Sequence, residues 1–200
     1  MVRRFAPTPV DRAVVDRAVR NATRAPSAGF SQGWGFLVLD TPEDVGRYWA
    51  TTAPDVERPD RWLSGMMTAP VLIVPCSSER FYRERYASPD KGWNDPAEQR
   101  FVKPYWDLDT AMASLLILLT AVDEGLGACF FGIPPARVGA LREGFGIPDD
   151  HDPIGVVALG HRLPEGPEST GNAGSAARRA RRPLEEVLHR GHWHGARHEA

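Results

Sequence analysis

The chain has 200 residues with 42% hydrophobic and 25% charged residues, a composition that is ordinary for one soluble globular domain. Its net charge of −2 excludes a general electrostatic attraction to nucleic acid or acidic membranes, and we see no apolar run of bilayer-spanning length. Two cysteines, Cys76 and Cys129, are too few for a disulfide framework, and the first residues lack the apolar region of a secretory signal, so we expect a cytoplasmic protein.

The first quarter of the chain predicts a helix, a turn, a strand and a second helix. Valine and alanine recur near a 3.6-residue period over residues 11–24, which predicts an amphipathic helix. Pro26 ends it, because proline has no N–H to donate and clashes with the preceding turn. A short apolar strand follows over 35–39. Residues 41–44 (TPED) then supply an N-cap, a proline at the first helical position and acids in the first turn of the next helix.

The middle of the chain holds the clearest strand and the clearest helix. The continuous apolar run at 69–75 predicts a fully buried strand. Residues 79–103 mix aromatic side chains with charges, proline and glycine and show no lasting period; we interpret them as a surface excursion, with a substrate-covering role as the alternative. Residues 107–124 predict a helix that is apolar nearly all round, and therefore central or at a subunit interface. Gly125 suits its left-handed cap.

The last third predicts a strand at 128–131, a helix opened by Pro134 that runs to Arg142, and a strand at 154–161. Residues 166–177 are glycine, serine, alanine and proline with little to pack, which is typical of a linker. A C-terminal arm follows, and residues 190–200 are expected to be a flexible tail. Helices and strands mix without a strict βαβ rhythm, so the predicted fold class is α+β, in a single domain over residues 1–200.

Residues 24–40 (RAPSAGFSQGWGFLVLD) join the first helix to the first strand through a tight turn. Gly29 permits backbone angles that other residues resist. We expect the turn at Pro26, Ser27, Ala28 and Gly29 to bring free backbone N–H groups and the Ser27 hydroxyl to the edge of a sheet. Such an edge suits a flat ligand that forms hydrogen bonds. An ordinary connection between a helix and a strand explains these residues equally well.

The segment RAPSAGFSQGW resembles the APSA-x-N-x-QPW turn of the nitroreductase family of FMN-dependent oxidoreductases. The flanks are similar in the same order: VRRFAPTPVDRAVVDRAV upstream, and GLGACFFG, VVALGHR and RRPLEEVL downstream. The resemblance extends from Val2 to about His189 and is weak between Glu57 and Lys103. It implies a central, mainly antiparallel sheet flanked by helices. It also implies a homodimer in which a C-terminal arm crosses onto the partner.

The resemblance also implies FMN as the cofactor, NAD(P)H as co-substrate and a small-molecule electron acceptor, with hydride transfer by a ping-pong mechanism. Because the flavin carries the chemistry, no catalytic acid or base is required of the protein. Arginine suits the cofactor phosphate, since its planar fork matches phosphate oxygens. The predicted cofactor-binding residues are Arg3, Arg4, Pro26, Ser27, Ala28, Gly29, Gln32, Phe131, Gly132, Arg179 and Arg181.

The expected roles of these residues differ, and for some of them a purely structural or solvent-exposed role is an alternative. Arg179 and Arg181 resemble phosphate ligands but also fit a solvated basic run. Arg3 resembles a ligand to the pyrimidine or ribityl edge, and Gln32 has a structural role as an equal alternative. The candidate substrate contacts are aromatic residues and methionines: Trp62, Met66, Met67, Tyr82 and Trp93.

The chain departs from the family pattern at three places. The family's earlier Arg-Arg-Ser, which helps to hold the phosphate, has no counterpart in this sequence. Phe30 stands where asparagine is usual, and Gly33 where proline is usual. These changes leave F420, a deazaflavin, open as an alternative cofactor. They also leave open a flavin- or F420-binding module without turnover, and a flavin-fragmenting, benzimidazole-forming enzyme of the same superfamily.

Two further patterns are weak. Four histidines near the C-terminus have ligand-like spacing, but a terminal His-rich tail is usually solvated, so we predict no metal site. Cys129 is expected to be a buried structural cysteine and not a reactive thiol. No GxSxG, P-loop or GxGxxG context is present, so acyl transfer, nucleotide hydrolysis and Rossmann-type binding have no support in the sequence.

Overall fold

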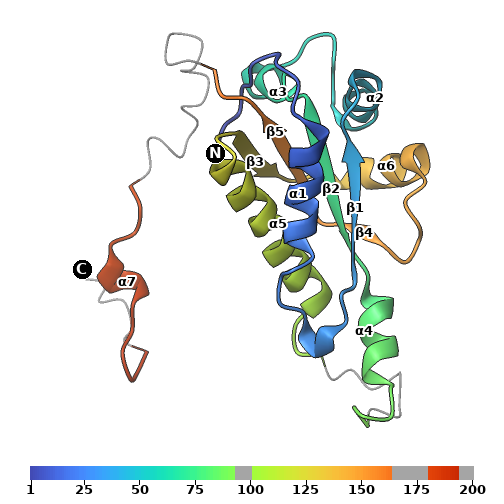
Figure 1. Ribbon diagram of the computed structural model, residues 1–200, viewed down its shortest axis with the longest axis vertical. Helices are drawn as coiled ribbons and strands as arrows, with labels where there is room; N and C mark the ends of the chain where they lie inside the picture. Colours follow the sequence, from blue (N-terminus) through green and yellow to red (C-terminus); the bar gives the residue numbers. More distant parts are fainter. Residues whose placement is uncertain (93–100, 164–179, 194–200) are drawn as a thin grey trace.

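An antiparallel sheet forms the centre of the protein (Figure 1). The computed structural model describes residues 1–92, 101–163 and 180–193. The path of the sheet is β1-β2-β5-β3, and a short strand, β4, pairs with the end of β2. The strands are β1 (Trp34–Leu39), β2 (Val71–Ser77), β3 (Gly127–Phe131), β4 (Asp152–Pro153) and β5 (Val156–Gly160). The expected α+β fold with an antiparallel sheet is confirmed.

Helices cover both faces of this sheet (Figure 1). One face carries α1 (Arg12–Ala22) and α5 (Tyr105–Asp123), and the other carries α2 (Pro42–Thr52), α3 (Arg61–Met66) and α6 (Val138–Phe145). The remaining helices are α4 (Glu79–Tyr86), α7 (Leu184–Val187) and the short 3-10 turns η1 (Ala28–Phe30) and η2 (Pro135–Arg137).

Strand β2 separates two apolar cores. Val71 and Ile73 pack with α1 and α5, whereas Leu72 and Val74 pack with α2, α3 and α6. Successive side chains of a strand point to opposite faces, so a strand covered on both sides must be apolar at every position. All seven residues of β2 are buried, as the run at 69–75 predicts, although the strand begins and ends two residues later than predicted.

The first two helices begin where the sequence predicts. The Asp11 carboxylate accepts a hydrogen bond from the Ala13 N–H, and the Thr41 hydroxyl accepts one from the Asp44 N–H. Side-chain oxygens at these positions satisfy N–H groups that have no partner in the first turn of a helix. The cap at Thr41 therefore acts as predicted, and the cap at Asp11 is an addition that was not predicted.

Helix α5 is buried on one side and exposed on the other. Its small and polar residues, among them Ala113 and Ser114, lie in the core against α1 and the sheet. By length and composition α5 is apolar enough to cross a membrane, which differs from our reading of the sequence. Its packing against both α1 and three strands identifies it as a core helix of this domain.

Several elements differ from the prediction. Residues 79–86 form α4, because arginine and glutamate pair one turn apart on its surface while the Tyr82 ring is fully buried. Helix α3 was not predicted, and the turn predicted at 26–29 extends into the 3-10 turn η1. The helix expected from Pro134 begins as η2 and continues as α6 to Phe145. The predicted linker at 166–177 lies outside the described residues, and residues 181–188 of the arm, which include α7, are exposed.

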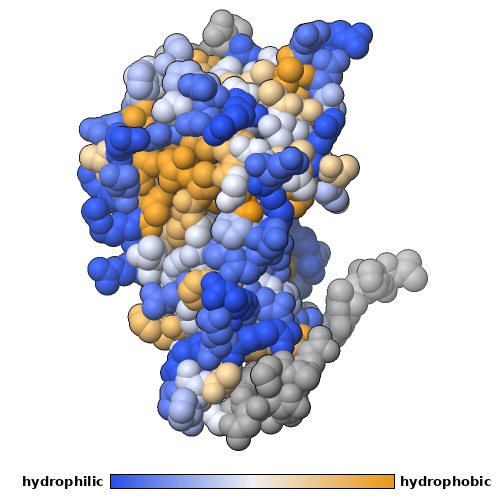
Figure 2. Space-filling view, turned by 90° about the vertical axis from the view of Figure 1, so that its right-hand side faces the viewer, coloured by the Kyte–Doolittle hydropathy of each residue, from blue (hydrophilic) through white to orange (hydrophobic). Residues whose placement is uncertain are grey.

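Strand β1 is the outer strand of the sheet on its side, and within the described residues only β2 pairs with it. Phe36, Leu37 and Val38 are half-buried there. Figure 2 shows the side of the molecule that lies to the right in Figure 1, with an apolar area framed by polar residues.

Candidate functional site

The turn between α1 and β1 has an unusual backbone. Gly29, Phe30 and Gln32 adopt φ angles of 62°, 58° and 52°, in the left-handed region. Glycine reaches this region without strain, but a side chain such as phenylalanine seldom does. The Phe30 side chain is 73% exposed, so packing within the described chain does not offset its strain. Strained residues of this kind cluster at functional sites.

A buried hydrogen-bond network lies under this turn. The carboxylate of Asp109, on α5, accepts hydrogen bonds of 2.7 Å from the Ala28 N–H and from the Tyr82 hydroxyl. The Ser27 hydroxyl oxygen accepts from the Gln32 N–H at 2.8 Å and lies 3.3 Å from the Tyr82 oxygen. Burial, and then the bond to Asp109, raise the pKa of Tyr82, so it stays a neutral donor.

This network corrects the expectation of a turn with free N–H groups. The N–H groups of Ala28, Phe30, Ser31 and Gln32 all have acceptors within the protein. Within the described residues, the N–H of Gly29 has none. The Gln32 side chain is exposed. The turn therefore has one backbone donor without an acceptor in the described structure and one exposed carboxamide, whereas the Ser27 hydroxyl bonds within the protein.

Helix α4 closes the turn from the other side. Arg85 Nε donates to the Gly29 carbonyl oxygen at 2.9 Å. A Cβ at position 29 would lie 2.8 Å from the Tyr86 ring, closer than real Cβ contacts. Gly29 is therefore required both by its left-handed backbone and by this close approach. The sequence did not reveal the roles of Asp109, Arg85 and Tyr86, because no local pattern links them to the turn.

Phe131 and Gly132, the other predicted cofactor contacts, line a cavity of about 230 Å³ between α2, α3 and the end of β3. The Phe131 ring stacks on Trp49 with centroids 5.7 Å apart and meets Trp62 edge-on at 5.6 Å. A Cβ at Gly132 would meet nothing within 4 Å, so the space beside its backbone is open. Phe130 packs into the core with α1 and α5 instead.

The N-terminal segment runs along the outer edge of β3. The Val2 N–H donates to the Ala128 carbonyl oxygen at 2.9 Å. A Cβ at Gly65, on α3, would lie 2.3 Å from the Arg3 carbonyl oxygen, so the segment also packs on α3. Burial raises the pKa of Cys129, while the nearby positive charge of Arg3 opposes this shift. Arg3 thus lies beside β3, and both Arg3 and Arg4 are half-buried.

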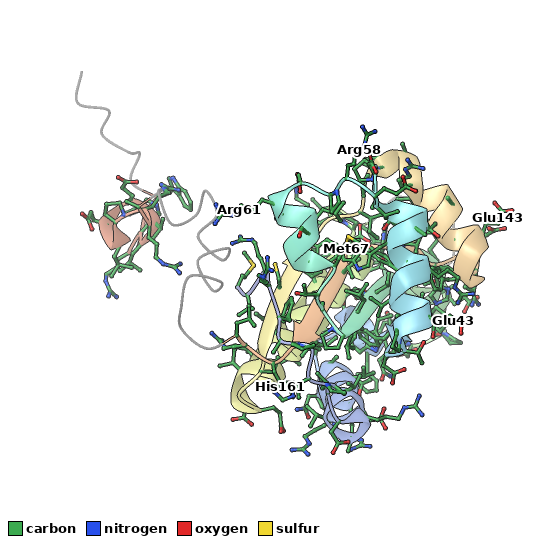
Figure 3. The ribbon with its side chains drawn as sticks, turned by 90° about the horizontal axis from the view of Figure 1, so that it is seen from above. Glu43, Arg58, Arg61, Met67, Glu143 and His161 are labelled. Carbon is green, nitrogen blue, oxygen red and sulfur yellow. The ribbon has the colours of Figure 1, made fainter. Side chains whose placement is uncertain are left out.

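The structure brings only some of the predicted residues together. Figure 3 shows Met67, one of the candidate substrate contacts, on the side of α3 that faces α2. Arg181 is exposed on the arm, and Arg179 lies outside the described residues. Of the candidate substrate contacts, Trp62 lines the cavity and Met67 lines a neighbouring one, whereas Met66 and Tyr82 are core residues. Trp93 lies outside the described residues.

The turn and Gly132 lie at opposite edges of one sheet. The pairing registers place Phe131 level with Leu37, with β2 and β5 between them. β3 and β1 are three inter-strand spacings apart, which is about 14 Å. Trp34, where β1 begins, lies a further three residues from Leu37 along the strand, which is about 10 Å. One chain therefore does not close a single pocket from these two groups.

The sequence profile of the nitroreductase family matches residues 1–161. This chain belongs to the nitroreductase family. A protein of Methanothermobacter thermautotrophicus, provisionally assigned as an NADH dehydrogenase/NAD(P)H nitroreductase, is 26% identical over 162 residues, which cover 80% of this chain and 71% of that protein.

Solved structures share the fold of this nitroreductase family member. A provisionally assigned NADH oxidase of Clostridium acetobutylicum superposes with a TM-score of 0.67 at 23% identity, covering 96% of this chain and 95% of that one. An FMN-dependent nitroreductase of Clostridium difficile R20291 gives 0.66 at 16% identity, covering 96% and 94%. At these identities the likeness establishes the nitroreductase fold alone. Membership of the family establishes an oxidoreductase.

The structure explains why Gly33 departs from the nitroreductase pattern, and it shows that the other departure, Phe30, has a strained backbone. A Cβ at Gly33 would lie 2.6 Å from the Ser78 carbonyl oxygen and 2.7 Å from the Tyr82 ring, so proline does not fit there. The asparagine that is usual at position 30 tolerates a left-handed backbone, whereas Phe30 adopts it at a cost. No feature of the described residues offsets that cost.

Within the described residues, no group of three or more histidine, cysteine or acidic side chains is placed to hold a metal ion. His194 and His198 lie outside them. Cys76 and Cys129 are both free and buried, and burial raises the pKa of Cys76 to about 11. The expected structural role of Cys129 agrees with its burial.

Proposed function

We propose that this protein is an FMN-dependent oxidoreductase that passes hydride from NAD(P)H to a small acceptor such as a nitroaromatic, quinone or enone. The overall reaction takes NAD(P)H, a proton and the acceptor to NAD(P)⁺ and the acceptor reduced by two electrons and two protons. When bound, FMN supplies the hydride chemistry. Support comes from membership of the family and from residues that suit such a cofactor.

The residues present fit a flavin in three ways. The Gly29 N–H lacks an acceptor in the described structure, and the Gln32 carboxamide is exposed beside it. Gly132 leaves open space where a planar ring can approach the backbone. Arg3 and Arg4 bring positive charge to the edge of β3, and we assign the phosphate to Arg179 and Arg181 of the arm.

We further propose that the site is built from two copies of the chain. The exposed side of α5 carries Leu108, Met112, Leu115, Leu119 and Val122, each between 37% and 60% exposed. They recur every three or four residues, which makes one continuous stripe along the helix. Antiparallel packing of two such stripes places the turn, at the N-terminal end of one α5, beside the C-terminal end of the other, from which β3 leads to Gly132.

The separation of the turn from Gly132 is the observation that carries this proposal. Because the width of the sheet separates the two groups within one chain, we propose that a flavin held by both lies between chains. The exposed apolar residues of the arm, Leu184, Val187, Leu188 and Trp193, suit an arm that crosses onto the partner. Two free cysteines agree with a reducing cytoplasm.

The visible spectrum and mass of the small molecule released from the purified protein test the cofactor. We expect FMN, a yellow protein, and catalytic oxidation of NADH or NADPH. A protein that stays colourless when incubated with FMN contradicts the proposal. Bound F420 would instead support the alternative cofactor, and flavin that is consumed in the presence of oxygen would support the flavin-fragmenting enzyme. Bound pigment without oxidation of NAD(P)H would support the binding module without turnover. In the same preparation, replacing Leu115 and Leu119 by glutamate is expected to convert dimers to monomers, as measured by light scattering.

A further inference from the structure

A cavity of about 470 Å³ lies between α2, the segment before α1 and the start of β2. Its volume is within the range of roughly 300–1,000 Å³ that is usual for pockets of small ligands. It lies on the side of the sheet that α2 and α3 cover, whereas the exposed stripe of α5 belongs to the other side. Met67 lines it between α3 and α2 (Figure 3), and Trp49 forms the wall that it shares with the cavity beside Gly132. This cavity is therefore distinct from the proposed cofactor site.

The walls of this cavity are apolar and offer few hydrogen-bond donors. Four valines and four prolines line it, and the prolines are Pro7, Pro9, Pro42 and Pro70. Proline has a fixed φ and no N–H, so these walls are stiff and contribute no backbone donor. The Thr68 hydroxyl is already used, since it donates to the Gly65 carbonyl oxygen at 2.7 Å and accepts the Phe5 N–H at 2.8 Å. A ligand that supplies its own donor therefore suits this cavity.

Asp40 is the one charged residue among the described residues that line the cavity. Its side chain is 19% exposed, and its Oδ2 accepts a hydrogen bond from Arg12 Nε at 3.2 Å. Within the described residues, Oδ1 has no hydrogen-bond donor. A carboxylate has about four acceptor sites, so Asp40 keeps capacity for a further donor. Arg12 is 77% exposed and does not line the cavity, so its guanidinium does not occupy the space that a ligand would take.

The charges at this end of the cavity favour a cation. Glu43, in the first turn of α2, is exposed (Figure 3), and Asp44 beside it pairs with Arg47 at 3.0 Å. These two acids offset the partial positive charge at the start of the helix. The ion pair of Asp40 with Arg12 is exposed and therefore weak, so Arg12 does not exclude a second cation. An anion would meet the Asp40 carboxylate between apolar walls, which disfavours it.

We infer that this cavity binds an organic monocation with an apolar body, and that the ammonium group of this ligand donates to Asp40 Oδ1. The valines and prolines contact the body, and Arg12 competes for the same carboxylate. One ring with a short alkyl chain suits the volume. The inference goes beyond the proposed function, because none of its residues is a predicted flavin contact and its ligand takes no part in hydride transfer.

Isothermal titration of the purified, full-length protein tests this with three probes of one shape. 4-Phenylbutylamine, 4-phenylbutan-1-ol and 4-phenylbutyrate carry a positive charge, no charge and a negative charge at neutral pH. The amine should bind about tenfold more tightly than the alcohol, because a hydrogen bond between charged groups is the stronger one, and the carboxylate should bind most weakly. Asp40→Asn should weaken amine binding about tenfold and leave alcohol binding within about twofold. An amine that binds no better than the alcohol, or a preference that survives Asp40→Asn, would overturn the inference.

Arg12→Ala should act in the opposite direction. It removes the competing cation, so amine binding should strengthen by about two- to fivefold while alcohol binding stays within about twofold. If Asp40 only held Arg12 in place and bound no ligand, no such gain would occur. Unchanged or weaker amine binding in this variant contradicts a carboxylate that is shared between Arg12 and the ligand.

Two exposed glycines in helices give a matched pair of controls. A Cβ at Gly46, on α2, or at Gly139, on α6, meets nothing within 4 Å, but only Gly46 lines the cavity. Leucine suits a helix better than glycine does, so both positions should tolerate it. Gly46→Leu should weaken the amine and the alcohol alike, and Gly139→Leu should weaken neither. The reverse pattern, or equal effects of the two variants, would place the ligand elsewhere.

The unsubstituted protein provides a test that does not depend on a variant folding. Bound 4-phenylbutylamine should show a nuclear Overhauser effect between its ring protons and the methyl group of Met67, and absence of this effect at saturating amine refutes the assignment. A colourless protein that shows the effect refutes the proposed function alone. A yellow protein that oxidises NAD(P)H but does not show it refutes the cavity assignment alone.

Discussion

Asp109, on α5, bonds both to Ala28 of the turn and to Tyr82 of α4. Its removal should therefore lower the stability of the protein. Its side chain is 3% exposed and accepts two hydrogen bonds of 2.7 Å, one from Ala28 and one from Tyr82. Asp109→Ala loses both bonds and leaves two buried donors without an acceptor. At roughly 1.5–3 kcal/mol for each bond to a carboxylate, the free energy of unfolding should fall by about 4 kcal/mol.

Urea denaturation at fixed protein concentration measures this change, since association affects apparent stability. Tyr82→Phe removes the bond that both residues share, so the double variant with Asp109→Ala should lose about 1.5–3 kcal/mol less than the sum of the single losses. Ser114→Ala, buried on the same helix with only a local bond to Thr110, is the control and should cost about 1 kcal/mol or less. A loss under about 1 kcal/mol for Asp109→Ala, or strict additivity with Tyr82→Phe, would refute the network.

Three further outcomes follow from the same structure. Phe30→Asn should raise the free energy of unfolding by about 1 kcal/mol and the melting temperature by about 2–4 °C, because asparagine tolerates the left-handed backbone; a lower melting temperature contradicts this. Gly33→Ala should destabilise the protein by about 1–3 kcal/mol in urea, since its Cβ would lie 2.6 Å from a carbonyl oxygen; an unchanged midpoint would disprove that close approach. Hydrogen bonds from His151 and then Arg80 lower the pKa of Asp150 from 3.8 to about 2, so the stability that they contribute is complete above pH 4 and is lost as pH falls towards 2; Asp150→Asn should remove this part of the acid transition.

The sheet and the main helices were predictable because their signals are local. The apolar run of β2 reflects burial on two faces, and the caps at Asp11 and Thr41 mark helix starts through bonds that span two or three residues. The length of α5 followed from its apolar composition. Composition did not show which side of α5 remains exposed. Apolar residues occur all round the helix, so the exposed stripe does not stand out among them in the sequence.

The polar network of the site was not predictable, because its partners are distant in sequence. The Ala28 N–H and its acceptor on Asp109 are 81 residues apart, and Ser27 and Tyr82 are 55 apart. Tyr82 belongs to a stretch without hydrophobic periodicity, so its helix was missed: one buried ring and several surface ion pairs stabilise α4. The pairing of Trp49 with Phe131 likewise arises only when α2 packs on the sheet.

The family resemblance gave residues that suit a flavin, and the structure showed how far apart they lie. Ser27 illustrates the difference, since its hydroxyl faces the Tyr82 side of the turn and not solvent. Gly29 and Gln32 remain the groups that the turn presents outward. The two predicted contact groups stand at opposite edges of the sheet, a fact that no motif in the sequence contains.

Mixing two defective variants tests the shared site most directly. Gly29→Val distorts the turn, and Gly132→Leu fills the space beside β3, so each alone should lose FMN binding. If the site is shared between copies, unfolding and refolding an equal mixture should restore about one quarter of the FMN sites, because half the dimers are mixed and each mixed dimer has one intact site. Recovery of no FMN binding in mixed dimers whose assembly is confirmed would contradict a site built from two chains.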